Sequence, residues 1–363
     1  MSKEPSEFTA SRRQRTEKPK PTEKPKKKFS VAKTRRNQFM YGEFDSYYAK
    51  TLLGKLVGNI AFFSLVVGIC FAILFPLIRV MPVVLSEFRQ LDNPDVIWVP
   101  LQFSTLSFTA AIRVGFGNFT PMMWTIFYSI VTALIQIGVS AMAGYALGRV
   151  DFPFKNVVMA FVLLVIIVPP QALLIPQFLN FHNFDVLGII SLVTGDTVNL
   201  INNPSTLYLL SFLGFGVRQA IFIFIFRQFF RGLPNELEEA ALIDGCGFYK
   251  TFVRIAFPNA VPAIMTVFVL AFVWNYGDTY LTGYFHPEGP YLANSLSIVF
   301  ASHNQENLLM ALQRVYNLPL INTFIFDAVK HAAALIYLLP LLVIYFATQK
   351  KIVDNFERSG IVG

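Results

Sequence analysis

Long apolar runs alternate with short polar segments along most of this 363-residue chain. A membrane-spanning helix needs about 20 mostly apolar residues, and about six runs meet that requirement. Only helices and closed barrels satisfy their backbone groups inside a bilayer, and runs of this length are helical. The pattern therefore predicts an all-α integral membrane protein with about six transmembrane helices. The predicted spans lie near residues 57–78, 124–147, 156–178, 206–228, 259–282 and 331–349.

The overall composition agrees with several spans rather than one soluble core. Charged residues make up 14% of the chain and hydrophobic residues 54%, whereas soluble domains carry about 25% charged residues. The two cysteines, Cys70 and Cys246, cannot form a disulfide framework, and we interpret both as free thiols. The four histidines lack the spacing of metal ligands, so no metal site is predicted.

The basic charge is concentrated at the N-terminus, where 15 of the 30 Lys and Arg residues fall within residues 1–55. The tract "KPKPTEKPKKK" has no apolar period, which predicts a disordered tail over 1–55 and a membrane domain over 56–363. Such a tail could bind nucleic acid or anionic lipid. We favour a solvated cytoplasmic tail that sets orientation, without a nucleic-acid partner. No signal-peptide cleavage site follows the first apolar run.

The distribution of positive charge between spans predicts the orientation. The segment near 179–205 has no Lys or Arg, whereas Arg149, Lys155, Arg231 and Lys350 lie in the segments on the opposite side. Because positive residues favour the cytoplasmic side, both chain termini are predicted to be cytoplasmic.

Small residues and prolines mark two of the spans. Ser140, Gly144 and Gly148 recur every four residues, a pattern that allows close helix packing within one subunit or between subunits. Pro169 and Pro170 remove two amide donors from the third span, which must kink or break there. Freed carbonyls at membrane depth are tolerated beside protein or a water-filled cavity. Pro169 and Gln171 therefore mark either the edge of a polar pathway or a purely structural kink.

The fifth span ends in aromatic and polar residues. Trp274, Asn275, Tyr276 and Asp278 would bring rings and hydrogen-bonding groups together toward the outer half of the membrane. Aromatic faces beside amide and hydroxyl groups suit a sugar, and an aromatic belt at the membrane surface is the alternative.

A soluble-looking segment, which we call the bracket (residues 235–259), separates the fourth and fifth spans. Asn235 is a helix-capping residue type, and the run from Glu236 to Ile243 predicts a short helix with its acids in the first turn. Gly245 and Gly247 allow a turn before a second helix that starts at Phe248. We expect one rigid helix to join this segment to Trp274 and Asn275, so that the bracket can transmit force from a soluble partner. An inert connecting hairpin is the alternative.

The run "EAALIDGCGFYKTFVRIAFP" resembles the signature loop of importer-type ABC transporter permeases. That loop has Glu-Ala-Ala, three residues, Gly, nine residues, Ile, and Pro three residues later. The stretches "GYALGRVDFPFKN", "IIVPPQALLIP" and the tail "ERSGIVG" are similar to the maltose-type carbohydrate permeases, in the branch of the MalG-like subunit. The residues that match the signature or adjoin it are Glu239, Ala240, Ala241, Asp244, Gly245, Ile255 and Pro258.

The resemblance implies a multi-subunit carbohydrate importer in the cell membrane of a prokaryote. In that family a second permease forms the other half of the pathway, two ATPase subunits dock on the loop, and an extracytoplasmic binding protein delivers the solute. Glu239 matches the glutamate that pairs with a basic ATPase residue, and Gly360 and Gly363 lie in the tail that approaches the ATPases. ATP and Mg²⁺ belong to the partner subunits. In agreement, the sequence has no phosphate-binding loop ending in Gly-Lys-Ser/Thr, so we expect no enzymatic activity of its own.

Three other functions remain open at this stage. An importer for peptides or amino acids would share the same loop. An ion-coupled secondary transporter would need buried acids and inverted repeats, and Asp278 is the one candidate acid. An intramembrane enzyme would need paired acids, a Ser-His set or a metal cluster, none of which the sequence indicates.

Overall fold

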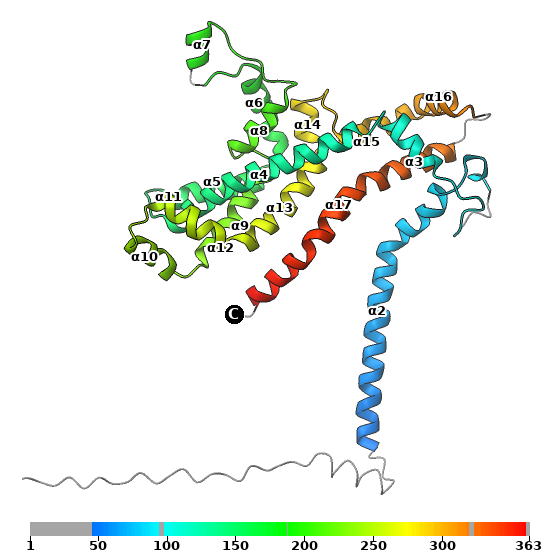
Figure 1. Cartoon of the computed structure of the whole chain (residues 1–363), viewed down its shortest axis with the longest axis horizontal. Helices are drawn as coiled ribbons and strands as arrows, with labels where there is room; N and C mark the ends of the chain where they lie inside the picture. The colour runs from blue at the N-terminus through cyan, green and yellow to red at the C-terminus, as the bar shows by residue number, and fades with distance from the viewer. Residues whose placement is uncertain (1–45, 94–97, 187, 319–322, 361–363) are drawn as a thin grey trace, which may run out of the picture. The chain divides into compact units, whose positions relative to one another are not determined.

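The computed structural model describes residues 46–93, 98–186, 188–318 and 323–360. Within these residues the secondary structure is helical, with two isolated β-bridges and no strand, so the predicted all-α class is confirmed (Figure 1). The longer helices are α2 (Ser46–Val84), α4 (Thr120–Arg149), α5 (Lys155–Ile167), α6 (Pro170–His182), α9 (Gln219–Arg231), α13 (Val261–Tyr276), α16 (Gln305–Tyr316) and α17 (Thr323–Gly360). Shorter elements are η1 (Phe88–Gln90), α3 (Leu106–Ala110), η2 (Ala111–Gly115), α7 (Ile189–Thr194), α8 (Pro204–Phe212), α10 (Glu236–Ile243), α11 (Phe248–Thr251), η3 (Phe252–Ala256), α12 (Phe257–Asn259), α14 (Tyr280–Phe285), α15 (Leu292–Val299) and η4 (Ser302–Asn304).

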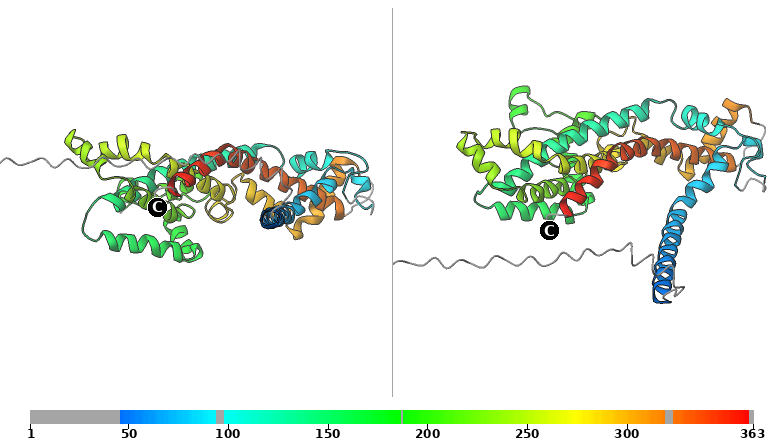
Figure 2. Two further views of the ribbon diagram at one scale, coloured as in Figure 1. Left: turned by 90° about the horizontal axis from the view of Figure 1, so that it is seen from below. Right: turned by 60° about the horizontal axis from the view of Figure 1, so that its bottom comes forward.

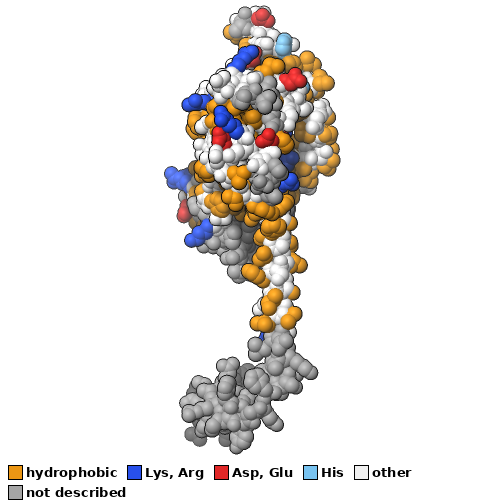
Figure 3. All heavy atoms as spheres, turned by 90° about the vertical axis from the view of Figure 1, so that its right-hand side faces the viewer, with side chains coloured by type: hydrophobic (Ala, Val, Ile, Leu, Met, Phe, Trp, Pro, Cys, Tyr) orange, Lys and Arg blue, Asp and Glu red, His pale blue; other side chains and the backbone are white. Residues whose placement is uncertain are grey.

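The chain divides after Leu74 into two units. In the first unit α2 begins at Ser46, so the predicted end of the tail at residue 55 falls inside a helix. Residues 1–45 lie outside the described part of the chain. From Gly54 to Leu74 every side chain is exposed, and most are hydrophobic (Figure 3). An exposed apolar helix of this length is suited to lipid or to another membrane helix.

Three single helices and two bent helix pairs are long and apolar enough to cross a membrane. The single helices are residues 54–84 of α2, α4, and residues 323–350 of α17. The pair α5–α6 bends by 104° at Pro169-Pro170, as the proline pair predicts, and the second pair bends by 76° between Asn259 and Val261. The described residues thus hold three to five candidate spans by length and composition, and the predicted count of about six is not confirmed.

The fourth predicted span, 206–228, is not one helix. It is divided into α8 and α9 by a loop in which Gly214 (φ +89°) and Arg218 (φ +51°) have left-handed backbone conformations. The mean hydropathy of a window of residues does not reveal such a break, because the residues on both sides of it are strongly apolar.

The centre of the second unit is a close contact between α4, α9 and α13, with α17 packed on α13 (Figure 1 and Figure 2). A Cβ atom added at Gly144 would lie 2.6 Å from the Cβ of Phe226, and one at Gly148 would lie 3.3 Å from the Arg227 carbonyl oxygen. The small-residue stripe therefore serves packing within one subunit, where α4 meets α9.

Candidate functional site

The first helix of the bracket, α10, covers the predicted residues Glu236–Ile243. Its first turn holds three carboxylates, which the helix dipole favours. It ends in a Schellman turn: Gly245 has φ +73°, its amide donates to Leu242 O, and the Cys246 amide donates to Ala241 O at 2.9 Å. The chain therefore reverses within two residues and starts α11 at Phe248.

Arg149, the last residue of α4, joins that helix to the start of the bracket. Its guanidinium donates hydrogen bonds to the carbonyl oxygens of Phe230 and Leu233 and to the side-chain oxygen of Asn235. Its Nε also lies 3.4 Å from a carboxylate oxygen of Glu238. Asn235 occupies the N-cap position, but its side chain makes no cap hydrogen bond, so the predicted side-chain cap is wrong. The Asn235 side-chain oxygen accepts a hydrogen bond from Arg149 instead.

An aromatic cluster attaches the second helix of the bracket to α4. The Tyr145 ring stacks on Phe248 at 5.1 Å and contacts Phe252 at 5.2 Å and Phe230 at 5.3 Å. Edge-to-face and stacked aromatic pairs contribute about 0.5–1.5 kcal/mol each beyond the area they bury. Both helices of the bracket are therefore held by the last turns of α4.

The bracket presents an apolar face outward. The exposed fractions are 86% for Ile243, 65% for Leu242 and 66% for Tyr249, whereas Ala241 is 1% exposed. Ala241 thus packs against its own chain, contrary to the prediction that both alanines enter a partner's groove. Ala240 is exposed, and its contact with a partner stays a prediction. Glu239 is exposed and forms no ion pair with any described residue. Its role toward a partner stays a prediction.

The bracket and α13 do not form one rigid helix, contrary to expectation. Residues 252–256 form a π-turn, in which the Phe257 amide donates to Phe252 O, and the helix then bends by 76° at Ala260. Pro258 and Pro262 each lack an amide donor, which weakens the helix at this point. Ile255 lies in the π-turn, half-buried, and Pro258 is exposed in α12.

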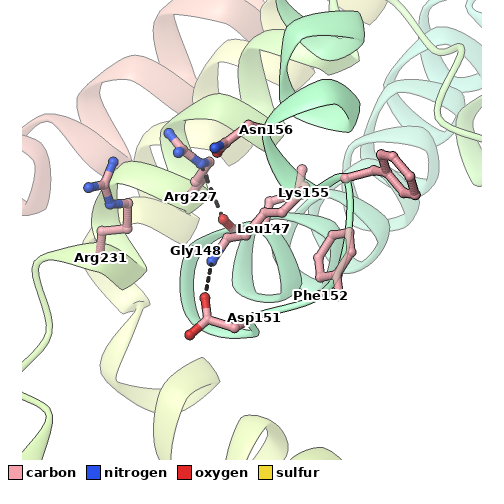
Figure 4. Close-up of a pocket in the computed structure, with 9 residues that line it drawn as sticks. Leu147, Gly148, Asp151, Phe152, Lys155, Asn156, Arg227 and Arg231 are labelled. Carbon is pink, nitrogen blue, oxygen red and sulfur yellow. Dashed lines mark hydrogen bonds and ion pairs between the residues drawn. The ribbon is translucent and has the colours of Figure 1, made fainter.

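A hollow of about 550 Å³ lies beside the same end of α4, between α5 and α9. Figure 4 shows Lys155, Arg227 and Arg231 around it, with Asp151 as the one acidic lining residue. Lys155 is 3.3 Å from Asp151, and Arg227 Nε donates to Leu147 O at 3.3 Å. Lys155 and Arg231 are also among the residues from which the sequence predicts a cytoplasmic location for this end, and that location stays a prediction.

The residues predicted to line a pathway do not converge on one surface. Asn275 is 1% exposed and donates to Gln136 Oε1 of α4 at 2.9 Å, while the buried Tyr276 hydroxyl donates to Tyr337 O at 3.1 Å. The Asp278 carboxylate accepts from the amides of residues 280–282, so it caps α14. These three side chains therefore have structural partners within the chain.

The other members of the predicted pathway set are accessible. Pro169 and Gln171 are exposed at the α5–α6 bend. Trp274 is half-buried, stacks on Phe222 at 5.4 Å, and lies 4.8 Å from the guanidinium carbon of Arg218. For the tail, Gly360 is the last residue of α17 and Gly363 lies outside the described residues, so an ATPase contact there stays a prediction.

Sequence reasoning did not single out four residues that organise this region. The sequence pattern marks Arg149 only by its charge, and it does not identify Arg218, Gln136 or Gln219 as members of the site. A signal existed for three of them, because Arg218, Gln219 and Gln136 are polar interruptions of apolar runs. The partners of Arg149 lie more than 80 positions away in the sequence, which no local pattern reveals.

Comparison with known proteins gives consistent matches. Residues 140–356 match the family described as the binding-protein-dependent transport system inner membrane component. A probable ABC transporter permease protein of Mycoplasma genitalium is 26% identical over 340 residues, covering 89% of this chain and 95% of that protein. An alpha-glucoside transport system permease protein of Rhizobium meliloti is 27% identical over 235 residues, covering 65% of this chain and 54% of that protein.

The fold matches a solved transporter structure. A bacterial ABC transporter involved in the import of the acidic polysaccharide alginate superposes with a TM-score of 0.62 at 19% identity, over 82% of this chain and 97% of that chain. At that identity the match concerns the fold alone.

Proposed function

Because the chain belongs to the family of binding-protein-dependent transport system inner membrane components, we propose that it is a permease subunit of an ATP-driven carbohydrate importer. It is a multi-pass membrane protein with three to five candidate spans among its described residues. In the proposed complex it forms half of the pathway, and a second permease forms the other half. ATP is hydrolysed by separate subunits that dock on the bracket.

The bracket is fixed to α4 on one side and exposes apolar residues on the other, and this arrangement is the main support for the proposal. Its base is bonded to α4 through Arg149 and Tyr145, whereas Leu242 and Ile243 on α10 are exposed. An element with a free apolar face is suited to transmit the motion of a docked partner when its other side is fixed to a helix. The contacts with α4 fix the bracket in this way, so that a force on α10 is passed to α4. We infer that this face enters the ATPase and that Glu239, at its edge, meets a basic ATPase residue.

The substrate class is inferred from the relatives. The permeases of Rhizobium meliloti and Streptococcus pneumoniae are described as components of alpha-glucoside and maltodextrin transport systems. Similarity to these permeases favours a carbohydrate over a peptide or an ion as the solute of this chain. We further propose that the bracket and both termini are cytoplasmic and that an extracytoplasmic binding protein delivers the solute.

The complex can be tested by purifying the tagged chain from membranes of its native host. Mass spectrometry should identify an ATPase, a second permease and a binding protein. Ile243→Glu should abolish ATPase recovery and leave recovery of the second permease unchanged. Leu192→Glu on α7 is the matched control, because Leu192 is also 86% exposed but lies in another loop. Equal ATPase recovery with both variants would exclude the bracket as the docking element.

A further inference from the structure

Arg218 lies level with the middle of α4, which is a candidate membrane span. It lies at the break before α9, beside Gly216, whose added Cβ would come within 2.2 Å of Gln136 Nε2. Gln136 follows the start of α4 by 16 residues and precedes its end by 13. At about 1.5 Å per residue, that level is roughly 20 Å from either end of a membrane-spanning helix. The break is therefore within the apolar layer rather than at its surface.

The guanidinium of Arg218 stays at this depth instead of extending to the membrane surface. It lies 4.8 Å from the centroid of the Trp274 ring, and the adjacent Asn275 is bonded to Gln136. Trp274 is in turn stacked on Phe222. A cation over an indole face is favourable, and the contact fixes the side chain in place.

No described group neutralises this charge. The ion pairs among described residues are Arg149–Glu238 and Lys155–Asp151, and the Arg218 guanidinium donates no hydrogen bond to a described residue. Behind it, the Nε2 atoms of the buried Gln136 and Gln219 have no acceptor, and Asn275 Oδ1 has no donor. A charged group at this depth faces a water-filled cavity or a partner, since lipid contact is strongly unfavourable.

We propose that Arg218 is the anion-recognising residue of the translocation pathway and that the solute is a negatively charged carbohydrate. This inference rests on the proposed function and adds the substrate class. One face of the guanidinium is on Trp274, and its N–H edge remains free to bind a carboxylate or phosphate through two parallel hydrogen bonds.

The test uses the full complex with its binding protein, reconstituted in proteoliposomes. Three probes are compared: maltose as the neutral sugar, digalacturonate as the carboxylate and glucose 6-phosphate as the phosphate. Uptake of at least one anionic probe, and not of maltose, is expected. The probe that is carried identifies whether the acid is a carboxylate or a phosphate.

Arg218→Gln should lower uptake of that anionic probe by about tenfold or more, because a hydrogen bond to a charged group is lost. Complex assembly should be unchanged, and Arg218→Lys should retain part of the uptake. Arg314→Gln, which removes an exposed cation on α16, is the control and should transport normally.

Three results would overturn the inference. Preferred uptake of maltose, or normal anion uptake by Arg218→Gln, would exclude anion recognition. Loss of the assembled complex in Arg218→Gln would instead identify Arg218 as an ion-pair partner of the second permease. Failure of the proposed function itself is distinguishable, since it would appear as absence of an ATPase from the purified wild-type complex.

Discussion

The Arg149 guanidinium, on the last residue of α4, lies 3.4 Å from the Glu238 carboxylate on α10 while it also bonds two carbonyl oxygens near the end of α9. The Arg149 side chain thereby connects three helices: the candidate membrane span α4, the end of α9, and α10, the first helix of the bracket. Its side chain is 10% exposed and that of Glu238 is 24% exposed, so the ion pair is shielded more than an ordinary surface pair.

Arg149→Ala should uncouple ATP hydrolysis from uptake. The substitution removes four contacts and leaves carbonyl groups without a donor, at about 1–3 kcal/mol of folding free energy. Arg149→Lys should rescue little, because an ammonium group cannot reach the same set of acceptors. Solute uptake per ATP hydrolysed in proteoliposomes is the measurement. Unchanged stoichiometry in Arg149→Ala would show that the bracket is positioned by other contacts, chiefly the Tyr145 cluster.

Ala241→Trp and Ala240→Trp should fail in different ways. Ala241 is buried against its own chain, so an indole there should destabilise the isolated subunit by about 1–3 kcal/mol through overpacking. Ala240 is exposed, so Ala240→Trp should leave the thermal unfolding of the purified subunit unchanged and reduce ATPase binding. Identical behaviour of the two variants in both assays would argue against this assignment of faces.

Gly245→Val should lower stability and coupling together. Gly245 has φ +73°, and a left-handed backbone costs a β-branched residue about 1–2 kcal/mol. No heavy atom lies within 4 Å of an added Cβ, so the effect arises from the backbone and not from a clash. Gly245→Asn should be milder, because asparagine tolerates this conformation. Gly247→Ala is the control: the Gly247 φ is −75°, and an added Cβ there also has open space. A destabilised Gly247→Ala would contradict this explanation.

Asn275→Leu should destabilise the packing of α4 against α13. The side chain donates to Gln136 Oε1 at 2.9 Å and to Ala271 O at 2.7 Å, and its loss leaves a buried amide unpaired at about 1–3 kcal/mol. In a double-mutant cycle, Gln136→Leu should recover part of that loss, because both polar groups are then removed. Additive effects would mean that the two amides act independently. Reduced uptake with unchanged stability would restore the pathway role of Asn275.

The sequence predicted those features that depend on neighbouring residues. The apolar runs locate α4 and α13, Pro169-Pro170 locates the 104° bend, and the run from Glu236 gives the bounds of α10. It did not predict the break between α8 and α9, because the glycines and Arg218 are averaged into strongly apolar surroundings.

Partners distant in the sequence were also beyond prediction. Asn275 and Gln136 are 139 positions apart, and the depth of Asn275 alone could not distinguish a solute contact from a helix contact. Asn235 has the residue type of a cap, but its side chain is bonded to Arg149 from another helix. In both cases a hydrogen bond to a residue distant in the sequence takes the place of the role predicted from the residue type.

The π-turn at residues 252–256 has a consequence for how this segment can vary among relatives. Such a turn holds one residue more than an α-helical turn, and the extra residue is accommodated as a local bulge. Deleting one residue here would restore regular α-helix and rotate everything before it by about 100° about the axis. Ala241 would then turn away from its packing site, and the outward face of α10 would point in a new direction. The number of residues in this short turn thus sets the angular register between α10 and α13, and an insertion or deletion within it would redirect the proposed docking face of α10 without altering any residue on that face.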